Sequence, residues 1–160
     1  MNELTHFNQN GEAVMVDVSP KADTEREACA KGKIYMSEEC FSLVKNGGMK
    51  KGDVLAVARV AGIMGAKKTP ELIPLCHILN LAKAEVEFEY LDQECAIEAS
   101  CTVKTFGKTG VEMEALTGVN TALLTIYDMC KAADKSMKIT DIRLCMKTGG
   151  KSGTFMRERD

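Results

Sequence analysis

The sequence predicts an α+β fold in which helices pack on one face of an antiparallel sheet, and three observations lead to this prediction. Two neighbouring segments alternate apolar and polar residues with the period of a strand. Two other segments are apolar enough to form buried helices. The predicted elements follow one another in the order β, α, α, β, β, α, β, which is the split βαβ arrangement of ferredoxin-like folds.

The length and composition indicate one globular unit. The chain has 160 residues, of which 45% are hydrophobic and 28% are charged, a balance typical of a folded domain of this size. We expect a single domain over residues 1–160, with an irregular N-terminal arm at 1–22 and a flexible C-terminal tail at 148–160. Within the arm, residues 15–18 are suited to a short strand that Pro20 ends.

The first strand is expected over residues 26–36. Ser37 follows it, and a serine ahead of two glutamates is a suitable N-cap for a helix. This helix should end near residues 46–48, where two glycines stand.

Asp53 is expected to open a second helix. Its run over residues 54–63 is apolar almost all round, which predicts burial against other helices or against another subunit. Pro70 and Pro74 then interrupt regular structure, because proline lacks a backbone N–H donor.

A β-hairpin is expected next. Residues 83–90 and 97–104 both alternate apolar with polar side chains, and the turn between them falls at residues 91–93. One face of this hairpin is polar, as antiparallel sheets allow.

A long helix and a last strand complete the predicted fold. Thr109 and Glu112 have the spacing of a capping box at the start of an apolar helix that reaches about residue 133. The last strand covers residues 137–146, and its alternation changes phase at Thr140 and Asp141, which predicts a β-bulge.

Charge and composition exclude several classes of partner. The net charge is −2, and the chain has only three Tyr, five Phe and no Trp to stack on bases, so nucleic acid is not expected. The first twelve residues do not resemble a secretory signal, and no apolar run is long enough to cross a bilayer. We therefore expect a cytoplasmic protein with no membrane partner.

The seven cysteines form no C-x-x-C pair, and only two histidines accompany them. This pattern predicts reduced thiols that serve mostly as small buried side chains, with no metal site. We also expect no cofactor.

Several lysines stand in or beside glycine-containing or apolar stretches, which indicates a small anionic ligand. Neither glycine-lysine turn, at 107–109 or 150–152, has the upstream glycine that a nucleotide-triphosphatase loop requires. Residues 147–153 can still place backbone amides and two ammonium groups around phosphate oxygens, or they can form a tail without function. The lysines concerned are Lys51, Lys67, Lys68, Lys108, Lys131, Lys147 and Lys151.

Two places in the sequence carry candidate catalytic residues. Asp128 and Lys131 are three residues apart and therefore share one face of the long helix, where they form either a catalytic pair or an ordinary ion pair. His77 stands in a loop and is suited to acid-base work, to phosphate contact or to a structural role. Cys76 beside it is a nucleophile only if its pKa is depressed.

Two glutamates open the long helix. Glu112 is assigned to the capping box, whereas Glu114 points to a different side of the helix. Glu114 can accept hydrogen bonds from a guanine-like ring, or it can be a solvated carboxylate that the helix dipole favours.

Five segments, taken in order, resemble the cyclic pyranopterin monophosphate synthase family, also called molybdenum cofactor biosynthesis protein C. They are residues 15–19, 51–54, 72–77, 108–116 and 125–131. The resemblance extends from residue 4 to about residue 155, almost the whole chain.

The resemblance implies a ferredoxin-like homohexamer, a trimer of dimers, with active sites between subunits. The implied enzyme is a phosphorus-oxygen lyase that converts 3′,8-cyclo-7,8-dihydro-GTP to cyclic pyranopterin monophosphate and pyrophosphate. Its catalytic groups match Asp128, Lys51 and Lys131. Its substrate-binding positions match Leu75, Cys76, His77, Glu112, Met113 and Glu114, with Arg26, Lys67, Lys147 and Lys151 near the triphosphate.

One position departs from the family pattern. The family usually places proline after the histidine, whereas this chain has Ile78, which restores a backbone N–H donor and relaxes the backbone of His77. From the residues alone, the alternative is a non-catalytic ligand-sensing ferredoxin-like module that binds a small anion.

Overall fold

The structure is a computed structural model that describes residues 5–158. The first four residues of the expected arm and the last two of the expected tail lie outside the described residues.

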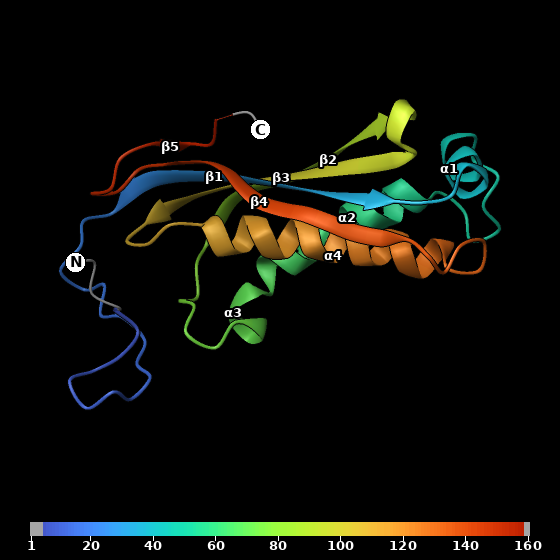
Figure 1. Cartoon of the computed structure of the whole chain (residues 1–160). Coiled ribbons are helices and arrows are strands. Elements are labelled where there is room, and N and C mark those ends of the chain that lie inside the picture. The colour runs from blue at the N-terminus through green and yellow to red at the C-terminus, as the bar shows by residue number, and fades with distance from the viewer. Residues whose placement is uncertain (1–4, 159–160) are drawn as a thin grey trace.

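The described chain forms one five-stranded antiparallel sheet in the order β2-β3-β1-β4-β5 (Figure 1). The central strand β1 (Thr24–Tyr35) pairs along its whole length with β3 (Ala96–Gly107). On its other side β1 pairs with β4 (Lys138–Thr148), and β2 (Leu81–Leu91) lies at the edge beside β3. The first four strands therefore have the order of a ferredoxin-like sheet.

Two helices, α2 (Val54–Lys67) and α4 (Glu112–Cys130), pack against each other and on the same face of this sheet (Figure 1). The short helix α1 (Glu38–Lys45) follows β1 at one end of the sheet, and α3 (Thr69–Leu72) follows α2. The predicted α+β, ferredoxin-like fold with helices on one face is confirmed.

Alternation in the strands places the core between sheet and helices. Ala30 and Ile34 of β1 and Ile97 of β3 are fully buried. Gly32 of β1 allows close packing, because a Cβ atom there would lie 2.9 Å from Cδ1 of Leu123 in α4. A side chain at this position would separate helix and sheet.

The α2–α4 contact also depends on glycine. A Cβ atom on Gly62 would lie 3.0 Å from the main-chain oxygen of Gly118, and a Cβ on Gly118 would lie 3.2 Å from that of Gly62. The two helices thus approach through facing glycines. On its other side α2 exposes Val57, Val60 and Met64, so the expected burial of its apolar run is only partial within one chain.

The opposite face of the sheet is polar, as predicted. Glu98 of β3 accepts from the ammonium of Lys31 at 3.0 Å and from the guanidinium of Arg143 at 3.2 Å. The predicted β-bulge is also confirmed, because the β1–β4 register shifts between Lys31 and Lys33, and Asp141 has φ +57°.

Three local predictions differ from the structure. Helix α4 begins at Glu112 after Val111 and has no side-chain cap hydrogen bond, so the capping box at Thr109 is wrong. A capping box requires its glutamate at the third helical position, whereas Glu112 is the first residue of α4. Residues 15–18 form no strand. The segment after β4, in which no strand was expected, contains β5 (Phe155–Met156) paired with β4.

Candidate active site

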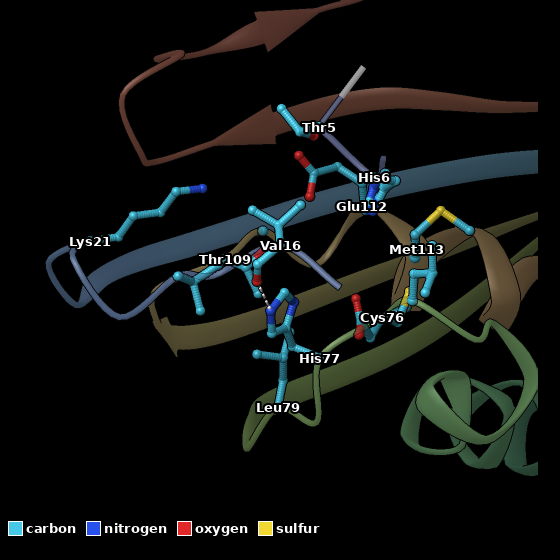
Figure 2. Close-up of a pocket in the computed structure, with 14 residues that line it drawn as sticks. Thr5, His6, Val16, Lys21, Cys76, His77, Leu79, Thr109, Glu112 and Met113 are labelled. Carbon is cyan, nitrogen blue, oxygen red and sulfur yellow. Dashed lines mark hydrogen bonds between the residues drawn. The ribbon is translucent and has the colours of Figure 1, made fainter. Parts of the chain in front are cut away.

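A cavity of about 280 Å³ lies at the N-terminal end of α4 (Figure 2). It brings the loop after α3 together with the first turn of α4 and with part of the N-terminal arm. Its lining includes six predicted binding residues, namely Leu75, Cys76, His77, Glu112, Met113 and Glu114.

The loop that carries His77 is tied to the arm. The Nε2 atom of His77 lies 2.7 Å from the main-chain oxygen of Val16, and this contact is drawn in Figure 2. A carbonyl oxygen can only accept, so Nε2 carries the hydrogen, and Nδ1 is the acceptor of the neutral ring. His77 is thus held in one tautomer, with an acceptor nitrogen available to the site.

Glu114 is the most perturbed carboxyl of this cavity. Its residue is only 3% exposed, and burial raises its pKa to about 7. A carboxyl group with this pKa is partly protonated near neutral pH, so it can donate as well as accept a hydrogen bond. Burial and the charge of Glu114 also raise the pKa of Cys76. The depressed pKa that a Cys76 nucleophile requires is therefore not present.

Glu112 lies over the turn that precedes α4. A Cβ atom on Gly110 would fall 2.0 Å from Oε2 of Glu112, so the carboxylate occupies space that only glycine leaves open at this position. Met113 is exposed beside it. The first turn of α4 thus presents one buried carboxyl, one partly exposed carboxylate and a thioether to the cavity.

A second cavity, of about 480 Å³, adjoins the first. Lys21 lines both of them. The other described residues of the second lining supply positive charge, hydroxyl groups and small side chains, and none of them is a carboxylate: Ala22, Thr24, Arg26, Gly150, Lys151 and Ser152. Lys147 donates to the hydroxyl of Ser152. The predicted phosphate-contacting residues Arg26, Lys147 and Lys151 therefore gather at one place.

Lys67 lies elsewhere in the chain. It lines a third cavity together with Ile63 and with the segment that leads into β2. Leu79 lines both this cavity and the one that holds His77. Lys67 is thus separated from Arg26 and Lys151 within one chain.

Lys51, Asp128 and Lys131 form a cluster at the C-terminal end of α4. The Lys51 ammonium nitrogen lies 3.1 Å from the main-chain oxygen of Asp128, and that of Lys131 lies 2.6 Å from Oδ1 of Asp128. Lys131 and then Lys51 lower the pKa of Asp128, and Asp128 raises the pKa of Lys131. All three residues are exposed, so the cluster faces outward.

The cluster and the cavity lie at opposite ends of one rigid element. Asp128 follows Glu114 by fourteen positions in α4, which corresponds to about 21 Å at 1.5 Å per residue. One chain therefore does not bring the predicted catalytic residues to the predicted binding residues.

Lys21 and Thr24 are among the residues of these cavities that sequence reasoning missed. Lys21 and Thr24 stand where an irregular arm meets the first strand, a region without a recognisable motif. The one available signal was a lysine close in sequence to Arg26.

Within residues 5–158, no three histidine, cysteine, aspartate or glutamate side chains come together as a metal-binding group. No helix in this described part is long and apolar enough to cross a membrane.

Comparisons with known proteins agree along nearly the whole chain. The model of the MoaC family matches residues 15–150. A cyclic pyranopterin monophosphate synthase of Heliobacterium modesticaldum is 58% identical over 99% of this chain and 99% of its own length. Proteins of the same name from Chloroflexus aurantiacus and Clostridium botulinum are 58% and 57% identical, over 99% and 98% of this chain and 97% and 99% of their own lengths.

Proposed function

The chain belongs to the MoaC family, and from this membership we propose that it is a cyclic pyranopterin monophosphate synthase of molybdenum cofactor biosynthesis. Its substrate is 3′,8-cyclo-7,8-dihydro-GTP, and its products are cyclic pyranopterin monophosphate and pyrophosphate. The observation that carries this proposal is end-to-end similarity to synthases at 58% identity. No observation favours a module that only senses a ligand.

We assign the base of the substrate to the first cavity. Glu114 is buried and bears a carboxyl with a pKa of about 7, which suits the N–H and carbonyl groups of a guanine-derived ring. His77 offers an acceptor nitrogen, while Leu75 and Met113 supply apolar contacts. Arg26, Lys147 and Lys151 are assigned to the phosphates, because they gather at the adjoining cavity.

We assign Lys51, Asp128 and Lys131 of a neighbouring subunit to the catalytic role. About 21 Å of helix separates them from Glu114 in the same chain, whereas proton transfer needs hydrogen-bond contact. Lys67 lies outside the cavity that Arg26 lines, and we assign the Lys67 of a neighbouring subunit to the phosphates in the same way. The exposed apolar side chains of α2, Val57 and Val60, support association. A homohexamer built as a trimer of dimers is the assembly we propose.

The chemistry that these groups must perform has two parts. The guanine-derived ring of the substrate is opened and rebuilt as a pterin, which requires proton transfer. A sugar hydroxyl oxygen attacks the α-phosphorus, the bond from that phosphorus to the bridging oxygen breaks, and pyrophosphate leaves. Asp128 and one lysine act as base and acid, and the remaining cations stabilise the leaving group. This places the enzyme among the phosphorus-oxygen lyases, and we expect it in the cytoplasm.

The test is direct. Purified protein is incubated with the cyclised dihydro-GTP, and both pyrophosphate and the pterin product are measured, with GTP as the control substrate. We expect release from the cyclised compound alone. Absence of release from protein that remains folded would refute the proposed function.

A further inference from the structure

Arg26, Lys147 and Lys151 are assigned to the phosphates above, and other residues of the second cavity also have the properties of an anion site. The described residues that line it include Lys21, Arg26 and Lys151, and none of them bears a carboxylate. Positive potential in a concave site is therefore not neutralised by its own walls. Lys21 has no ion-pair partner within residues 5–158.

Lys21 is held in position although it belongs to an irregular segment. Its amide donates to the main-chain oxygen of Val18 at 3.0 Å, and the Ser19 amide donates to Oδ1 of Asp17 at 2.9 Å. The ammonium of Lys108 also donates to the Ser19 oxygen at 2.9 Å. These three bonds order the turn that presents Lys21. In Figure 2 its side chain extends at the opposite end of the first cavity from Cys76 and Met113.

Thr24, the first residue of β1, provides a separate indication. Its hydroxyl oxygen is buried and has no hydrogen-bond partner among the described residues. It belongs to the wall of the second cavity. A buried hydroxyl without a partner is unfavourable, and an anionic oxygen in the cavity would accept the hydrogen bond that it offers.

Arg26 gives the cavity a fixed donor. Its Nε donates to the main-chain oxygen of Gly107 at 2.9 Å, and its Nη2 donates to that of Lys108 at 3.2 Å. The remaining nitrogen, Nη1, lies beside Gly150, where a Cβ atom would approach it to 2.3 Å. The guanidinium is thus oriented before any ligand binds, which favours recognition of phosphate oxygens.

We propose that Lys21 and Thr24 are further phosphate-binding residues of this site, with Lys21 at the junction of the two cavities and Thr24 in the pyrophosphate end. This proposal rests on the proposed function and extends its site by two residues. Lys21 contacts the phosphate next to the sugar, because among residues 5–158 it alone lines both cavities. The Thr24 hydroxyl donates to the pyrophosphate that leaves. One subunit therefore holds both the base and the phosphates.

The test uses inorganic pyrophosphate with the full-length assembled protein, and it measures the dissociation constant by calorimetry at two salt concentrations. Loss of one charge-assisted contact in Lys21→Gln is expected to weaken binding about tenfold and to reduce its salt dependence. Thr24→Val, which keeps the shape and removes the hydroxyl, is expected to weaken binding about fivefold. Lys21→Arg should restore binding to near the wild-type value, because it restores the charge.

Matched controls lie on the polar face of the sheet. Lys33→Gln and Thr102→Val change the same residue types away from both cavities, and their dissociation constants should equal that of the wild-type protein. Binding in Lys21→Gln and Thr24→Val that also equals wild type overturns the inference, as does a wild-type protein that does not bind pyrophosphate. This outcome is distinct from failure of the proposed function, which is judged by turnover of the cyclised substrate.

Discussion

The ammonium of Lys51 lies 3.1 Å from the main-chain oxygen of Asp128, a residue 77 positions further along the chain. This contact joins the turn before α2 to the last turn of α4, whose carbonyl groups carry partial negative charge. Lys131 binds the carboxylate of the same aspartate. The end of α4 thus presents one carboxylate and two ammonium groups to the outside of the subunit.

Replacing Asp128 by Asn and Lys131 by Gln together should abolish turnover while the protein stays folded. We expect pyrophosphate release to fall at least about 100-fold, because acid-base groups contribute on that order. Exposed ion pairs add little to stability, so the midpoint of thermal unfolding should change by only about 2 °C. Lys33→Gln with Glu94→Gln removes a comparable pair, between β1 and the turn that joins β2 to β3, and should leave turnover intact. Full activity in the Asp128 and Lys131 variant would show that this pair is not catalytic.

Two inactive variants should complement each other in mixed assemblies. Glu114→Gln damages the cavity of its own subunit, and Asp128→Asn damages the cluster that the subunit offers to its neighbour. Random mixing should restore about one quarter of the sites, since each of the two contributions is intact half of the time. Turnover after co-refolding is the measurement. A mixture that stays as inactive as its parents would show that both groups of residues serve the same subunit.

Stability should respond to pH through Glu114. Burial raises its pKa from 4.5 to about 7 in the folded protein. Between these values the folded state binds more protons than the unfolded state, so the free energy of unfolding falls as pH rises and levels off above about 7. The full effect is about 3 kcal/mol.

Urea unfolding of wild-type protein and of Glu114→Gln, at one protein concentration across this pH range, measures the difference. The free energy of unfolding of the Gln variant should not show this decrease with pH, because the Gln side chain does not titrate. Parallel pH curves for the two proteins would mean that Glu114 ionises at its ordinary pKa.

Gly150→Ala should disturb the phosphate cavity. Gly150 has φ +76°, and a Cβ atom would meet Nη1 of Arg26 at 2.3 Å, so alanine both strains the turn and displaces the guanidinium. Gly153→Ala is the matched control, because Gly153 has φ +65° but open space around its Cβ position. Each substitution should cost about 1 kcal/mol of stability through backbone strain. Only Gly150→Ala should also weaken pyrophosphate binding, and equal binding by the two variants would contradict the role of Arg26.

Most of the secondary structure could be predicted from local patterns. Ser37 and Asp53 cap α1 and α2 as expected, since an N-cap depends only on a side chain and amides two or three residues away. The bulge at Asp141 was visible as a change in alternation. The cap of α4 was predicted wrongly, because Thr109 has the right spacing but the chain becomes helical only from Glu112. Strand β5 was missed, because it is two residues long and exists only through pairing with β4.

The sequence by itself determined the order of helices and strands along the chain, the fold class with helices on one face of the sheet, and the residue types that the proposed chemistry needs. These depend on periodicity and on side-chain identity, which are local properties. Only the tertiary structure decided which of those residues meet. Arg26 meets Lys147 and Lys151 because β4 pairs with β1 and the loop after β4 closes over the start of β1. Asp128 stays about 21 Å from Glu114 because an unbroken helix cannot bring its two ends together.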